Sequence, residues 1–103
     1  MRFSRVDQLV GAGLSLPVAV NVAICELSLV SAQRSEGSAR WMARHVAEVL
    51  TDGCTFDAVR RHCVAPEWEA PWRDLARWTS EPVRSRCLTL ARLCRRNGLR
   101  VVS

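Results

Sequence analysis

The sequence predicts an all-α fold, an irregular bundle of about five helices around one apolar helix near residues 15–35. Apolar residues recur at helical spacing in each long segment. Ser, Pro and Gly stand where such helices would begin and end. Tyrosine is absent, only two Phe occur, and runs of β-branched residues are short. With 103 residues and neither a repeat nor a linker, the chain is expected to form a single helical domain over 1–103.

The segment from Leu14 to Arg34 carries two apolar faces when it is placed on a helix. One stripe comprises Val18, Val22, Cys25, Leu29 and Ala32, and the other comprises Val20, Ile24 and Leu27, widened by Ala23 and Val30. The polar residues that separate the two stripes are Asn21, Ser28 and Ser35 on one side and Glu26 and Gln33 on the other. A surface helix needs only one apolar face. We therefore expect the second face to be covered by another chain, in the first place a second copy in a homodimer.

The seven-residue spacing of Asn21, Ser28 and Ser35 suggests how such a dimer could be aligned. Single buried polar residues fix the register of helical dimers. We therefore expect these three side chains to pair across the two-fold axis or to set its register.

Capping residues delimit the remaining helices, which are expected at 4–10, 38–52, 55–63, 71–79 and 81–96. The predicted N-caps are Ser4, Ser15, Ser38, Thr55 and Ser80. Gly37 is expected to close the long apolar helix, and Asn97–Gly98 to end the last helix. Residues 64–71, with Pro66 and Pro71, are predicted to form a loop.

The excess positive charge lies at the C-terminal end of the chain. Residues 1–80 hold nine Arg and nine acidic residues, so the net charge of +5 comes from residues 81–103. Of the arginines in this region, Arg84, Arg92, Arg95 and Arg96 are expected on the outer face of the last helix, around Leu88. They are candidate contacts for phosphate or for an acidic partner, although a solvated helix face has the same pattern.

A helix-turn-helix motif does not fit the segment 55–72. Cys63 would stand in the turn position usually held by Gly, Glu69 would fall in a buried position, and Pro71 would break the second helix. Nucleic-acid binding is therefore possible through the arginines but not favoured.

The cysteines and histidines indicate neither a metal site nor a catalytic centre. Five cysteines with no C-x-x-C pair are typical of reduced thiols in a cytoplasmic protein, most of them at apolar helical positions. His62 and Cys63 are adjacent, so their side chains diverge on a helix and cannot form a dyad. Paired carboxylates and a glycine-rich phosphate loop are missing. We expect no enzyme activity, no metal and no cofactor.

The N-terminal region resembles a signal peptide or a membrane span only in part. Asp7, Asn21 and Glu26 interrupt the apolar stretch, and Pro17 stands at its beginning. We therefore expect no membrane association.

The tryptophans are the remaining candidates for a binding surface. Trp41 lies on the border between the inner and outer faces of its predicted helix. Trp68, Trp72 and Trp78 fall within eleven residues. Most are expected in the core, but Trp is seldom fully buried and is common among interface hot spots. The residues expected at a dimer or partner interface are Val20, Ile24, Leu27, Trp41, Trp68, Trp78 and Leu88.

These observations favour a small regulatory protein that binds another protein, a transcription factor or nucleoprotein machine that it inhibits or sequesters. The first alternative is a small DNA-binding regulator that uses the C-terminal arginines, and a structural subunit is a third possibility.

Overall fold

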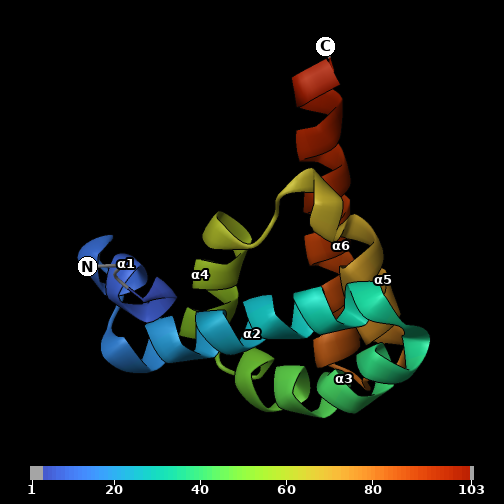
Figure 1. Ribbon diagram of the computed structural model, residues 1–103, viewed down its shortest axis with the longest axis horizontal. Coiled ribbons are helices and arrows are strands. Elements are labelled where there is room, and N and C mark those ends of the chain that lie inside the picture. The colour runs from blue at the N-terminus through green and yellow to red at the C-terminus, as the bar shows by residue number, and fades with distance from the viewer. Residues whose placement is uncertain (1–3, 103) are drawn as a thin grey trace.

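The computed structural model describes residues 4–102, with side chains through Leu99, and within this range the chain is helical and has no β-strand. The elements are α1 (Arg5–Gly11), α2 (Leu16–Arg34), α3 (Glu36–Leu50), α4 (Gly53–His62), the 3₁₀ turn η1 (Pro66–Trp68), α5 (Glu69–Arg77) and α6 (Val83–Val102). The all-α prediction is confirmed. Six α-helices form where about five were expected, one at each of the predicted segments (Figure 1).

The core is formed by buried residues from all six α-helices, from Leu9 of α1 to Cys94 of α6. α2 contacts α1, α3, α4 and α5, and α6 packs mainly on α5 and η1. Val22, Cys25 and Leu29 of α2 are fully buried, so one of its two predicted stripes faces the core. Trp72 of α5 is the largest fully buried side chain among the described residues. Its indole nitrogen donates a 2.9 Å hydrogen bond to the Cys63 carbonyl oxygen.

The corner between α2 and α3 consists of one residue, Ser35. Ser35 has an extended backbone, and its hydroxyl oxygen accepts a 3.1 Å hydrogen bond from the Ser38 amide. Ser35 therefore caps α3, and the prediction that Ser38 does so is wrong. Gly37 lies inside the first turn of α3 and does not close α2, because the extended Ser35 already ends that helix. The two longest helices of the first half of the chain are thereby packed side by side (Figure 1).

The caps of α4 and α6 also differ from the prediction. Asp52 caps α4, because its carboxylate accepts from the Thr55 amide at 3.0 Å and from the Thr55 hydroxyl at 2.7 Å. At α6 the carboxylate of Glu81, and not Ser80, accepts the Ser85 amide at 2.7 Å. In both places a carboxylate accepts a backbone amide at the helix N-terminus, where a hydroxyl was expected to do so.

The predicted loop 64–71 is largely helical. It contains η1 and the first turn of α5, where Pro71 is tolerated because a first-turn residue needs no N–H partner within the helix.

The last helix continues through Asn97 and Gly98, where the sequence predicted its end. The Asn97 amide donates a 2.8 Å hydrogen bond to the Val64 carbonyl oxygen. A Cβ on Gly98 would lie 3.3 Å from Cβ of Pro66, so the missing side chain lets α6 pass close to η1. These two residues attach α6 to the 64–68 segment, and the end of α6 extends away from the other helices (Figure 1).

Candidate interaction surface

Four polar residues of α2 form hydrogen bonds within the chain, three of them to other elements. Asn21 donates to the Thr55 hydroxyl of α4 at 3.0 Å, and Gln33 donates to the Glu67 carbonyl at 3.4 Å. Glu26 accepts from Arg5 of α1 at 2.8 Å, in an ion pair. Ser28 is fully buried and donates to the Ile24 carbonyl at 2.9 Å. With Ser35 capping α3, the expectation that Asn21, Ser28 and Ser35 align a dimer is wrong, because all three are occupied inside the protomer.

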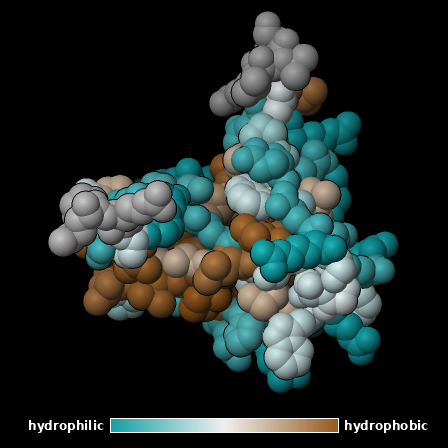
Figure 2. All heavy atoms as spheres, viewed as in Figure 1, coloured by the Kyte–Doolittle hydropathy of each residue, from teal (hydrophilic) through white to brown (hydrophobic). Residues whose placement is uncertain are grey.

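The second apolar face of α2 is in part exposed among the residues that the structure describes. Leu16 and Leu27 are 61 % and 64 % exposed, and Val20 and Val30 are each 40 % exposed. Figure 2 shows hydrophobic side chains gathered along the α2 side of the molecule. We call this face the outer stripe, and it comprises Leu16, Val20, Ala23, Leu27, Val30 and, at its C-terminal end, Arg34. It is the kind of exposed apolar surface that marks an interaction site.

Trp41 of α3 is 74 % exposed. A shallow groove between α2 and α3 is lined by Ser31, Ser38, Trp41 and Met42, among others. On its other side Trp41 contributes to a hollow with Arg40, Arg44 and His45. A large exposed aromatic ring next to arginines is the composition of an interface hot spot.

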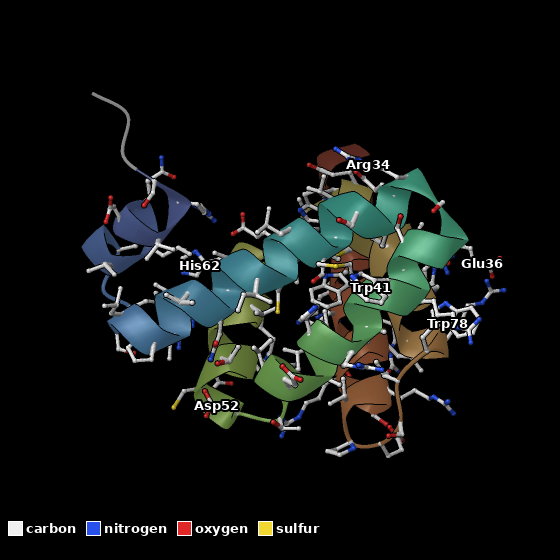
Figure 3. All side chains as sticks on the ribbon, turned by 60° about the horizontal axis from the view of Figure 1, so that its bottom comes forward. Arg34, Glu36, Trp41, Asp52, His62 and Trp78 are labelled. Atoms are coloured by element: carbon white, nitrogen blue, oxygen red, sulfur yellow. The ribbon has the colours of Figure 1, made fainter. Side chains whose placement is uncertain are left out.

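Trp78, at the end of α5, extends this aromatic surface (Figure 3). The Arg40 guanidinium lies over its ring, 5.4 Å from the centroid, and a small hollow is lined by Glu36, Gly37, Arg40 and Trp78. Glu36 also pairs with Arg77 at 2.7 Å. We call the exposed set Arg40, Trp41, Arg44, His45 and Trp78 the Trp41 surface.

The other predicted interface residues lie elsewhere or are partly covered. Ile24 is half-buried at the edge of the outer stripe. Trp68 is half-buried and packs against the core. Leu88 is exposed, but it lies on α6.

The four candidate arginines Arg84, Arg92, Arg95 and Arg96 are all exposed on α6. Arg84 donates to the Thr79 carbonyl and Arg92 to the Leu88 carbonyl, at 3.1 and 3.3 Å. Within residues 4–99, none of the four forms an ion pair with an acidic side chain. Among the described side chains, the negative charge of Glu81 acts on one of them, Arg84.

Among the described residues, the thiols and the other possible metal ligands do not cluster into a site. Cys54 is exposed, and the other four cysteines are buried and unpaired by disulfides. In the described part of the chain no three His, Cys, Asp or Glu side chains group closely enough to hold a metal ion. Burial raises the pKa of the Cys87 thiol to about 12, so it is neutral.

α2 also satisfies the length and composition of a membrane-spanning helix, with a mean hydropathy of 1.5 over 18 residues. Core helices of compact proteins meet the same criterion. A third of that window is buried inside the molecule. The exposed side chains of α2, such as Leu27, form a face that a lipid surface or a protein could cover.

Sequence reasoning found most of the outer stripe but missed Leu16, Arg34 and the contribution of Arg40. The available signal was the alternation of four- and three-residue steps from Leu16 to Arg34, which is regular over the whole helix. Arg40 could be recognised only once α5 placed Trp78 beside it. The chain matches no known family model, no curated protein and no solved structure.

Proposed function

We propose that the chain is a small regulatory protein, not an enzyme, that acts in the cytoplasm by binding another protein. The observation that carries this proposal is the exposed aromatic ring of Trp41, next to arginines and at the groove between α2 and α3. Exposed Trp and Arg side chains contribute strongly to binding when a partner excludes water from them. The proposed partner is a transcription factor or nucleoprotein machine that the chain inhibits or sequesters. This target class rests on small size and helical make-up, not on a motif.

We also propose that the chain acts as a homodimer through α2. Four of the six outer-stripe residues are exposed Leu or Val side chains, and apolar faces of this kind are normally covered in solution. The two surfaces then have separate tasks, because the outer stripe binds a second copy and the Trp41 surface remains for the regulated protein.

Site-specific crosslinking tests the proposed function. A photo-reactive phenylalanine analogue replaces Trp41 in the host cell, and the crosslinked protein is identified by mass spectrometry. The control carries the same analogue at Arg61, an exposed residue of α4. We expect a regulatory protein crosslinked from position 41 and not from position 61, with Trp41→Ala weakening its binding at least about tenfold. Identical products from both positions would contradict the proposal.

The exposed arginines of α6 favour a second candidate, binding of DNA. Arg92, Arg95 and Arg96 lie on the helix that extends from the molecule, without an acidic partner among the described side chains. If they bind phosphates, the affinity for duplex DNA must fall steeply with salt and must be lost on their replacement by Gln. Salt-independent binding of a protein, unchanged in the Arg→Gln variant, would favour the first candidate.

A further inference from the structure

The outer stripe has the spacing of a two-helix seam. Its positions 16, 20, 23, 27, 30 and 34 alternate in steps of four and three, as core positions of paired helices do. At about 100° per residue they fall within about 80° of the helix circumference. This regular pattern points to one helix lying along α2, in preference to an irregular protein surface.

We infer that this helix is α2 of a second copy, packed antiparallel to the first. The two-fold axis crosses the helix pair at the level of residue 25. The inference rests on the proposed homodimer and specifies its geometry. In this register Val20 faces Val30 of the partner subunit, and Ala23 faces Leu27 of the partner subunit. Leu16 faces Arg34 of the partner subunit, whose aliphatic stem covers it.

Side-chain size favours this register over a parallel one. Leu27 is the most exposed side chain of the stripe, and Ala23 is its smallest and is half-buried. The antiparallel pair places each Leu27 over the small side chain of Ala23 of the partner subunit. A parallel pair would set Leu27 against Leu27 and Ala23 against Ala23, leaving one layer crowded and the next one empty.

Charge gives the same preference. The stripe carries no charge from Leu16 to Val30, and Arg34 is its only ionised member. A parallel pair would place the two Arg34 side chains together and align the two helix dipoles. The antiparallel pair separates the arginines by about 27 Å, from 18 residues at about 1.5 Å each. It also sets the C-terminal end of each helix beside the N-terminal end of the other.

The flanks of the stripe allow this approach. On one flank Glu26 lies near Glu26 of the partner subunit, and the ion pair with Arg5 already compensates its charge. On the other flank the half-buried Ile24 lies near the axis and meets Ile24 of the partner subunit. Because the contact is a single helix pair, we expect a dissociation constant in the micromolar range.

The register is tested by disulfide crosslinking in a Cys54→Ser background, which removes the exposed thiol and leaves four buried ones. Val20 and Val30 are equally exposed, at 40 % each, and form a matched pair of sites. A mixture of Val20→Cys and Val30→Cys chains carrying different tags should give at least about fivefold more crosslinked dimer than either variant alone. In a dimer of either variant alone, the new thiols of the two chains would be about 15 Å apart along the helix direction.

The occupant is tested by a second matched pair. Leu27 and Leu99 are both 64 % exposed, one on the stripe and the other near the end of α6. Leu27→Glu should weaken the dimer at least about 100-fold, because the change occurs twice in a symmetric interface. Leu99→Glu should leave the dimer intact, and circular dichroism should show both variants to be folded.

The possible failures are distinguishable. A dimer in which Val20→Cys and Val30→Cys each crosslink efficiently alone would overturn the antiparallel register and leave the homodimer standing. A wild-type monomer at 100 µM would overturn both the register and the homodimer. If that monomer floats with phosphatidylglycerol vesicles and Leu27→Glu does not, the stripe binds a lipid surface. The Trp41 crosslinking result stands apart from all of these outcomes.

Discussion

The side-chain amide of Asn21 donates a 3.0 Å hydrogen bond to Oγ1 of Thr55, and this contact joins α2 to α4. Thr55 is fully buried, and its hydroxyl in turn donates to the Asp52 carboxylate at 2.7 Å. The three residues form a chain of hydrogen bonds from the helix cap to the side of α2. A polar residue that the sequence placed at a dimer interface therefore holds the protomer together.

Replacing Asn21 by Ala should lower the free energy of unfolding by about 1–2 kcal/mol, because the buried Thr55 hydroxyl loses a donor. The dimer dissociation constant should stay unchanged, since Asn21 is not on the outer stripe. Urea unfolding and sedimentation of the same variant measure the two quantities. A weakened dimer with unchanged unfolding would instead return Asn21 to the interface.

Acid should destabilise the fold through Asp52. Hydrogen bonds from the Thr55 hydroxyl, and then from its amide, lower the pKa of Asp52. A carboxyl with a lower pKa in the folded chain adds stability above its unfolded pKa of about 3.9 and loses it as the pH falls through the folded value. The thermal midpoint should therefore be level above pH 5 and should fall below pH 4. Asp52→Asn should lower the thermal midpoint above pH 5 and should make its fall below pH 4 shallower. If the thermal midpoints of the two proteins followed parallel curves with pH, Asp52 would not be the group responsible.

Substitution by Phe should lower the stability of the fold at Trp72 but have little effect on it at Trp41. Trp72→Phe removes the donor to the Cys63 carbonyl and leaves a small cavity, so it should cost about 1–3 kcal/mol of stability. Trp41→Phe should change stability by less than about 0.5 kcal/mol, because Trp41 is exposed. Urea unfolding followed by circular dichroism compares the two variants. Equal losses would show that Trp41 is packed in the fold.

The thiols should divide into one reactive group and four protected ones. Cys54 is exposed, whereas burial raises the pKa of Cys94 to about 11 and that of Cys87 to about 12. Burial, with Cys87 and Glu26 nearby, raises the pKa of Cys25 still further. A chromogenic disulfide reagent at pH 8 should titrate one thiol rapidly in the native protein and five in denaturant. Cys54→Ser should abolish the rapid phase. Several fast thiols would indicate an open core.

The helices could be predicted from sequence because their apolar spacing is local information. The caps were predicted less well, since Ser35 and Ser38, or Asp52 and Thr55, offer competing oxygens within three residues. Only the chain geometry selects between them. The end of α6 was misplaced for another reason, because Asn97 and Gly98 are typical helix terminators. Here they bind the distant 64–66 segment instead.

The candidate site was predictable only in part. The surplus apolar face of α2 follows from periodicity alone, and its exposure agrees with the pattern. Which tryptophans are exposed depends on tertiary packing. Trp72 lies in α5 and is fully buried, whereas Trp78, six residues later at the end of the same helix, is exposed. The hydrogen bonds of Asn21 and Ser28 within the chain could not be predicted from sequence. To predict them, one must know where α4 lies and which side of α2 is buried, and no local pattern contains this information.

The most direct test of the account is sedimentation equilibrium of the unmodified chain at 10–100 µM, at low and at moderate salt. The monomer mass is 11.5 kDa. If a second copy covers the outer stripe, the measured mass should approach twice this value at the upper concentration. It should change little with salt, because the contact is apolar. A folded species that keeps the monomer mass throughout would contradict the central claim.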